Sequence, residues 1–129
     1  MGAGKIGETI AAMLLDSGDY QVTISDYSPD ALESCPDADG LTKLQIDASD
    51  TAALTSALAG HYAVLSASPY SLNKYIAEAA KAAKVHYFDL TEDVASTRLA
   101  KSLAEDSDTV FMPQCGLAPG FISIVANSM

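Results

Sequence analysis

The sequence predicts an α/β fold with a doubly wound parallel sheet. Short runs rich in β-branched and aromatic residues alternate with longer stretches of helical periodicity along the 129 residues. Strands separated by helices of this length form βαβ units with right-handed crossovers. The chain length, and an apolar share of 49%, suit one domain with a single core.

Five helices are predicted from apolar residues at helical spacing and from start and stop signals. Ser17-Gly18 and Gly60 read as helix stops, and Thr91 as a cap. In Ser28-Pro29 and Ser68-Pro69 the serine takes the N-cap position and the proline the first helical position. The predicted helices cover residues 6–15, a short stretch from 28, 49–58, 68–84 and 91–106, and residues 121–129 resemble the start of another.

Five strands are predicted from short β-rich runs that lie between these helices. The third of them is apolar on both faces, which is typical of a strand buried in a parallel sheet. No repeat at a fixed period and no long linker interrupts the alternation of strands and helices. The predicted strands cover residues 21–25, 41–46, 62–66, 85–89 and 109–112.

Composition excludes several classes of partner. Seventeen acidic and seven basic residues give a net charge of -10, which repels nucleic acids and anionic membrane surfaces. No apolar stretch approaches the roughly 18–20 residues of a membrane span. The chain has only two cysteines and no signal peptide, so we expect a reduced, cytoplasmic compartment.

The chain opens with a G-x-G-x-x-G motif that leads into the first predicted helix. Gly2 permits a tight turn, Gly4 lets the backbone approach a pyrophosphate, and Gly7 lets the helix pack closely. Together with Lys5 and Ile6, these residues form the predicted phosphate-binding loop of a Rossmann-type domain. The motif alone is weak, because a glycine-bearing turn can precede any helix.

A Rossmann sheet has a strand directly before this loop, at its centre, in the order 3-2-1-4-5-6. Here only Met1 precedes Gly2. We therefore expect a sheet that lacks its first, central strand, in a chain truncated at its start and at its end. Residues 1–129 are interpreted as a fragment of a dinucleotide-binding domain, and a substrate domain is expected downstream.

Asp26 ends the strand about 20 residues after the glycine loop, where a ribose-binding carboxylate belongs. Such a carboxylate accepts hydrogen bonds from both ribose hydroxyls and repels a 2′-phosphate. No Arg or Lys lies between Asp26 and Lys43 to neutralise that phosphate. The pattern favours NAD over NADP, and the alternative for Asp26 is a solvated turn residue.

Two further strand ends carry candidate cofactor contacts. Asp47 is placed to reach the adenine amino group, although capping of the next helix by the run 47–50 explains it equally well. At the end of the third predicted strand, small residues let the nicotinamide ribose pass close to the backbone: Ser66, Ala67, Ser68 and Pro69. A capped helix start at Ser68-Pro69 is compatible with this reading.

Asp89 is the best candidate catalytic group, because it ends a strand near the expected nicotinamide. A capping role beside Thr91 and Glu92 is the alternative, and it is favoured. Cys115 is interpreted as a small buried residue of the cleft, since an acidic chain does not stabilise a thiolate. Gly116 opens a rigid turn that lets the backbone approach the cofactor. No spacing of His, Cys and Asp indicates a metal site.

In this order, the motifs resemble the N-terminal domain of the saccharopine dehydrogenase family, which includes saccharopine reductases and lysine 6-dehydrogenase-like enzymes. The resemblance covers the whole chain and rests on the segments 2–7, Asp26, 66–70, 86–92 and 115–120. It implies an NAD(P)-dependent oxidoreductase that interconverts an amine and an imine of an amino-acid substrate. It also implies a homodimer formed through the downstream domain, and a fragment that is inactive alone.

Two other functions are compatible with the same residues. One is a regulatory NAD-sensing domain like those of potassium transport systems, which share the glycine loop and the strand-end acid. That alternative leaves the segments 68–70 and 116–120 unexplained. The other is a relative that kept the fold and lost hydride transfer, because a fold supports cofactor binding better than any one reaction.

Overall fold

The computed structural model describes residues 1–116 of the chain. Strands and helices alternate along it, and every strand pair within the described residues is parallel. The predicted α/β fold is therefore confirmed. The predicted helix start at 121–129, and the positions Pro119 and Gly120, lie outside the described residues.

The helices agree with the predicted periodicity to within a few residues, with one exception near residue 70. A short α2 begins after Ser28, whose Oγ accepts a 3.2 Å hydrogen bond from the Ala31 N–H, so this predicted N-cap is confirmed. None of the helices within residues 1–116 is long and apolar enough to cross a membrane. The helices are α1 Lys5–Asp16, α2 Pro29–Ser34, α3 Thr51–Leu58, the 3₁₀ turn η1 Tyr70–Leu72, α4 Asn73–Ala83 and α5 Val94–Ala104.

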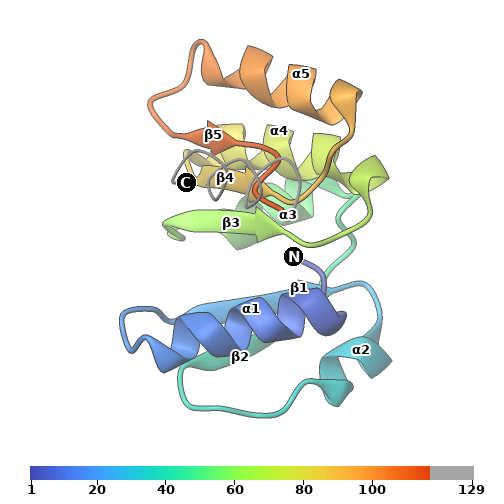
Figure 1. Ribbon diagram of the computed structural model, residues 1–129, viewed down its shortest axis with the longest axis vertical. Helices are drawn as coiled ribbons and strands as arrows, with labels where there is room; N and C mark the ends of the chain where they lie inside the picture. The colour runs from blue at the N-terminus through green and yellow to red at the C-terminus, as the bar shows by residue number, and fades with distance from the viewer. Residues whose placement is uncertain (117–129) are drawn as a thin grey trace, which may run out of the picture.

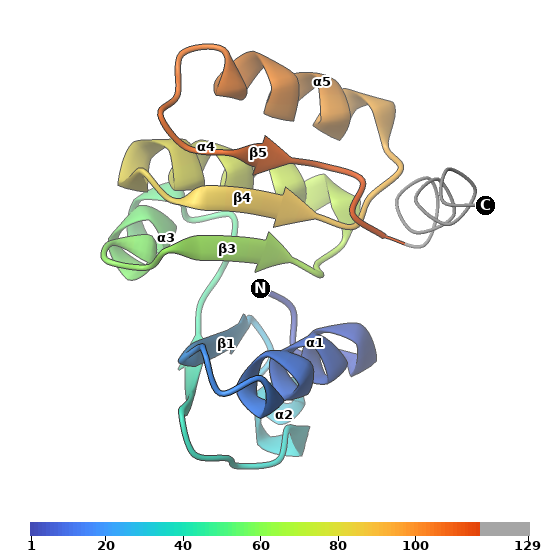
Figure 2. The ribbon, with the colours of Figure 1, turned by 60° about the vertical axis from the view of Figure 1, so that its left-hand side comes forward.

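The strands form two parallel groups, β1-β2 and β3-β4-β5. Figures 1 and 2 show these groups one above the other, with the N-terminus between β1 and β3. Helices α1 and α2 pack on β1, while α4 packs on β3 and β4, and α5 on β5. The strands are β1 Val22–Asp26, β2 Leu41–Gln45, β3 Ala63–Ser66, β4 His86–Asp89 and β5 Phe111–Met112.

Met1 and Gly2 lie in the space between the two groups and join them by hydrogen bonds. The Gly2 N–H donates to the Ser25 carbonyl on β1 at 2.7 Å. On the other side, the Met1 nitrogen donates to the Leu65 carbonyl of β3, and the Ala67 N–H donates to the Met1 carbonyl. The order is thus β2, β1, Met1–Gly2, β3, β4, β5, which fits a Rossmann sheet whose central strand is represented by two residues.

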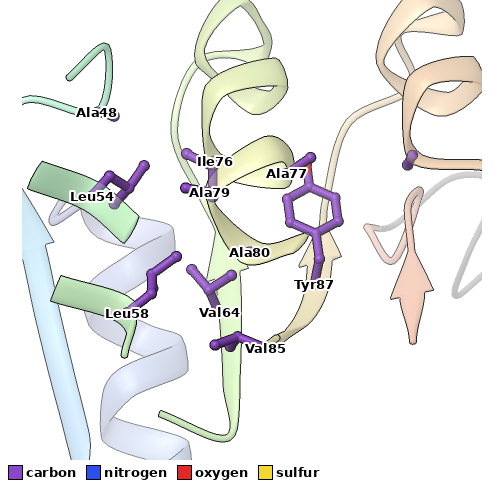
Figure 3. Packing of buried hydrophobic residues seen from close by; sticks show 11 residues of the cluster. Ala48, Leu54, Leu58, Val64, Ile76, Ala77, Ala79, Ala80, Val85 and Tyr87 are labelled. Carbon is purple, nitrogen blue, oxygen red and sulfur yellow. The ribbon is translucent and has the colours of Figure 1, made fainter. Parts of the chain in front are cut away.

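The larger core lies where α3 and α4 pack together against β3 and β4 (Figure 3). Small alanines on α4 let α3 approach closely, and Leu54 and Leu58 of α3 fill the space beside Val64. A smaller core under α1 and α2 is built on Ile24 and Leu32. The two cores hold the carboxyl ends of the strands at one edge of the molecule.

Helix α4 begins five residues and helix α5 three residues later than predicted, and local hydrogen bonds explain both shifts. Helix α4 begins at Asn73, not at Ser68, because the Ser66 Oγ accepts the Ser68 N–H at 3.4 Å and donates to Asn73 Oδ1 at 2.7 Å. Helix α5 begins after Asp93, whose Oδ2 accepts the Ser96 N–H at 2.7 Å. The predicted cap Thr91 instead accepts the Asp93 N–H.

Candidate functional site

The glycine loop packs tightly against the end of β3. Gly2 has a φ of 96°, a conformation that side chains rarely adopt, and a Cβ on it would lie 2.7 Å from the Ala67 carbonyl oxygen. A Cβ on Gly7 would overlap the Gly2 carbonyl oxygen. The positive φ of Gly2 agrees with the tight turn predicted there, and the contact at Gly7 agrees with the predicted close packing of the helix.

Helix α1 presents its N-terminus without a side-chain cap. Gly4 occupies the N-cap position in an extended conformation, and no side chain accepts from the first turn. The N–H groups of Lys5, Ile6 and Gly7 have no partner within the helix. The first helical hydrogen bond is the one that the Glu8 N–H donates to the carbonyl of Gly4, the N-cap residue. No atom lies within 4 Å of where a Cβ on Gly4 would stand. The helix end is thus open to an anion, which the helix dipole favours.

Asp26 stands beside this loop at the end of β1, and backbone donors fix its carboxylate. Its Oδ2 accepts the Ala3 N–H at 2.8 Å, and its Oδ1 accepts the Ser28 N–H at 2.9 Å. A carboxylate offers about four lone-pair sites, so each oxygen can accept one more hydrogen bond. Asp26 therefore orders the turn after β1 and contacts the glycine loop, and each of its carboxylate oxygens keeps a lone pair free.

Asp47 follows β2 and lies at the same edge of the sheet. Its Oδ1 accepts from the Ser49 N–H at 2.8 Å and from the Ser49 hydroxyl at 2.7 Å, and these bonds lower the pKa of the carboxyl. The N-cap of α3 is Asp50, which accepts the Ala53 N–H. Within the run 47–50, Asp50 is thus the N-cap of α3, and Asp47 orders the turn that precedes this helix.

A cavity of about 580 Å³ lies at the carboxyl ends of β1, β2 and β3 and brings most of the predicted cofactor residues together. Among the described residues that line it, none is Lys or Arg, and the charged side chains are those of Asp26 and Asp47. The predicted residues in its lining are Gly2, Gly4, Asp26, Asp47, Ala67, Ser68 and Pro69. Sequence reasoning missed Met1, Ser25, Tyr27, Ile46, Ala48 and Leu72.

Most of the missed residues lie next to predicted strand ends in the sequence. This adjacency is the signal that could have identified them as part of the cavity lining. Leu72 is different, because it lies in the lining only through η1, which the sequence did not predict. Tyr27 has an exposed ring at the cavity, and Ile46 and Ala48 flank Asp47. Apolar side chains beside two carboxylates give a lining that suits a planar, polar group such as an aromatic base.

Other predicted site residues lie outside this cavity lining. Lys5 and Ile6 are exposed on α1, and Gly7 lies behind the loop. Ser66 is buried, with its hydroxyl bonded to Asn73. Gly116 packs against Leu90, the residue that follows β4, since a Cβ on Gly116 would lie 2.8 Å from the Leu90 carbonyl oxygen.

Asp89 is completely buried at the end of β4, and its carboxylate joins two loops. Its Oδ2 accepts the Tyr87 hydroxyl at 2.7 Å, and its Oδ1 accepts the N–H groups of Thr91 at 3.1 Å and Gln114 at 3.0 Å. Burial and this hydrogen bond raise the pKa of Tyr87. Asp93 caps α5, so the capping alternative for Asp89 is wrong, and the geometry supports a role in holding the loops.

Cys115 contacts the residue that carries this buried carboxylate. Its N–H donates to the Asp89 carbonyl at 2.8 Å, and its Sγ lies 3.2 Å from the Met112 carbonyl oxygen. Burial, and then the Asp89 charge, raise the pKa of the thiol, so it remains protonated at neutral pH. Within residues 1–116, no group of three His, Cys, Asp or Glu side chains is arranged to hold a metal ion.

The fold and this cavity define an α/β nucleotide-binding domain of the Rossmann type. The chain belongs to the family described as the saccharopine dehydrogenase NADP binding domain, whose model matches residues 1–110. This finding confirms the predicted resemblance and identifies a nucleotide-binding domain of an oxidoreductase family. The family description names NADP and does not support the predicted preference for NAD.

A solved structure shows the same fold. Apo histidine-tagged saccharopine dehydrogenase (L-Glu forming) from Saccharomyces cerevisiae is similar with a TM-score of 0.87 and 20% sequence identity. The match covers 98% of this chain and 28% of that chain, so this chain spans about a quarter of the length of that structure. No curated protein matches the sequence.

Proposed function

We propose that the cavity at the glycine loop binds a nicotinamide dinucleotide, and that the chain is the cofactor domain of an oxidoreductase acting on a C–N bond of an amino acid. The observation that carries the proposal is the uncapped N-terminus of α1, which opens toward the cavity beside the fixed carboxylate of Asp26. The family membership of residues 1–110 supports it.

The net charge of -10 determines how an anionic cofactor is held. No cationic side chain lines the described cavity, so attraction must come from backbone N–H groups and the dipole of α1. The pyrophosphate then lies over Gly4, and Asp26 accepts from a ribose hydroxyl. The adenine fits the side lined by Tyr27, Ile46 and Asp47, and the nicotinamide half passes Ala67 and Ser68.

A bound nicotinamide ring supplies a hydride acceptor or donor, and the chain's own residues position it. The segment 66–69 is fixed by the Ser66–Asn73 hydrogen bond and by the Gly2–Ala67 contact. Exchange of hydride with a substrate amine also requires a proton-transfer group. Both oxygens of Asp89 are already engaged by protein donors, so a catalytic role for Asp89 stays a prediction, and a downstream domain is proposed to supply the substrate contacts.

Gly4→Ala is expected to weaken the binding of NADH by roughly tenfold or more. The added methyl group meets no protein atom within 4 Å, so it stands in the space through which the pyrophosphate approaches. Isothermal titration of NADH into the unmodified and variant chains measures the change. Urea unfolding of both chains is the control, and it should show a loss below about 1 kcal/mol, because alanine is only a poorer N-cap than glycine.

Unchanged NADH affinity in a folded Gly4→Ala chain would place the pyrophosphate elsewhere. The comparison is sharpest with NADH, AMP and nicotinamide mononucleotide titrated in parallel. Only the dinucleotide needs the full path across Gly4, so its affinity should fall more than that of either half.

We further propose that the site prefers NAD to NADP, because Asp26 repels a 2′-phosphate and no Lys or Arg lines the described cavity. Asp26→Asn is then expected to reduce the ratio of the Kd of NADPH to that of NADH by about tenfold. Asp30→Asn, an equal charge change on the exposed first turn of α2, is the matched control and should leave the ratio unchanged. A tighter Kd for NADPH in the unmodified chain would contradict this preference.

A further inference from the structure

The connection between β3 and α4 contains a helix-capping serine that does not cap a helix. Ser68 followed by Pro69 is a strong sequence signal for an N-cap and a first helical residue. In the structure Pro69 is instead extended, with a ψ of 142°, and η1 follows it without a side-chain cap. Helix α4, which begins at Asn73, has no side-chain cap either. The best local cap is therefore not used by the helix.

The Ser68 hydroxyl consequently remains available at the cavity beside the glycine loop. A capping Oγ would accept the N–H of Tyr70 or Ser71, the second and third residues of a helix that began at Pro69. Within residues 1–116, neither of these N–H groups has an acceptor, and Ser68 Oγ has no hydrogen-bond partner. Ser68 is half-buried and lines the cavity.

A buried hydrogen bond holds Ser68 in this uncapped state. Ser66 and Asn73 are each 2% exposed, and the Ser66 Oγ donates to Asn73 Oδ1 at 2.7 Å. The same Oγ accepts the Ser68 N–H at 3.4 Å. The bond joins the end of β3 to the first residue of α4. Turning Pro69 from extended to helical would shorten this connection, because the rise per residue falls from about 3.3 Å to about 1.5 Å.

The balance between the capped and uncapped states depends on Asn73. A serine N-cap and a hydrogen bond between two side chains stabilise a protein by similar amounts. The uncapped state has a further advantage, because breaking the bond would leave the buried amide oxygen of Asn73 without its donor. The capped state is thus the nearest alternative conformation, and it becomes favoured when Asn73 is removed.

Given the proposed binding of a dinucleotide, on which this inference rests, we propose that Asn73 is a positioning residue for the nicotinamide half of the cofactor. It acts through Ser66 and keeps Ser68 out of helix capping, so that the Ser68 hydroxyl binds the ribose that carries the nicotinamide. Asp26 is assigned the adenosine ribose at the end of β1, whereas Ser68 lines the cavity from the end of β3. A serine hydroxyl both donates and accepts, which suits a ribose hydroxyl.

Calorimetric titrations of ADP-ribose and ADP test the contact of Ser68, because only ADP-ribose carries the second ribose. Ser68→Ala is expected to weaken the binding of ADP-ribose about fivefold and that of ADP less than about twofold. Ser71→Ala makes the same change on the exposed η1, outside the described cavity lining, and should alter neither Kd. Equal weakening of both ligands by Ser68→Ala, or weakening of neither, would contradict the contact.

Asn73→Ala tests the positioning role by the direction in which amide exchange changes. If Ser68 then caps the helix, exchange at Tyr70 or Ser71 should slow about fivefold, whereas a general loss of stability would speed exchange at both. The Kd of ADP-ribose should rise about fivefold, with that of ADP nearly unchanged. Asn73→Asp keeps an oxygen that accepts the Ser66 hydroxyl, so it should restore the exchange rates and the ratio of the two Kd values.

Ser66→Ala breaks the same bond from its other end and decides the matter if Asn73→Ala does not fold. It is expected to produce the same slowing of exchange and the same selective loss of ADP-ribose. Faster exchange at Tyr70 and Ser71, or an unchanged Kd for ADP-ribose, would show that the bond between Ser66 and Asn73 does not position the site.

The titration of ADP separates a failure of this inference from a failure of the proposed function. A chain that binds ADP and ADP-ribose, with a ratio of Kd values that no variant changes, keeps the dinucleotide site and overturns the roles of Asn73 and Ser68. A folded chain that binds neither ligand overturns the proposed function, and this inference with it.

Discussion

Gly7→Ala is expected to lower the free energy of unfolding by about 1–3 kcal/mol and to abolish dinucleotide binding. The added Cβ would overlap the Gly2 carbonyl oxygen, and both partners are backbone, so no side-chain rotation relieves the clash. Helix α1 must then shift away from the loop, which moves the N–H groups of its first turn off the cavity. Helix propensity acts in the opposite direction, because alanine is favoured over glycine by about 1 kcal/mol.

The sign of the change in the free energy of unfolding, measured by urea unfolding of the variant, therefore distinguishes the packing clash from helix propensity. Gly4→Ala, in the same loop, is the matched control, because no protein atom surrounds its added Cβ. A Gly7→Ala chain that is as stable as the unmodified chain, or more stable, would mean that α1 does not pack on Gly2 as described.

Asp89→Ala is expected to cost about 3 kcal/mol or more, because it leaves three donors without their acceptor in a buried place. These donors are the Tyr87 hydroxyl and the N–H groups of Thr91 and Gln114. The loss separates the loop after β4 from the loop after β5, which Asp89 joins. Chemical denaturation followed by circular dichroism measures the cost.

Two milder variants rank the contributions of this cluster. Asp89→Asn keeps one acceptor oxygen, and Tyr87→Phe removes a single donor, at a cost of about 1 kcal/mol. Stability should therefore fall most in Asp89→Ala and least in Tyr87→Phe. An Asp89→Ala chain within about 0.5 kcal/mol of the unmodified one, as for surface changes, would show that the carboxylate does not hold the loops.

The elements were predictable where one local signal dominates. Apolar periodicity predicted α1, and Ser28 with Pro29 predicted the start of α2, because both signals lie within the helix that they predict or directly at its start. The start of α4 was not predictable, because the Ser66 hydroxyl binds Asn73 seven residues away and holds Ser68 outside the helix. Such a bond depends on where β3 ends, which propensity does not encode.

The candidate site was predictable to the same extent. Spacing from the glycine loop predicted the place of Asp26, and the structure adds the two backbone donors that fix it. Ser66 was predicted as a cofactor contact, yet it is turned into the protein toward Asn73. Leu72 enters the cavity through a 3₁₀ turn, and Asp89 binds Gln114, which lies 25 positions further along the chain, so both roles follow from tertiary packing.

The most direct test of the proposed function is a calorimetric titration of NADH and NADPH into the unmodified chain, first shown by circular dichroism to be folded. We expect one saturable site per chain, tighter for NADH than for NADPH, and competition by AMP through the adenine side of the cavity. If neither dinucleotide binds to a folded chain, the cavity at the glycine loop is not a cofactor site.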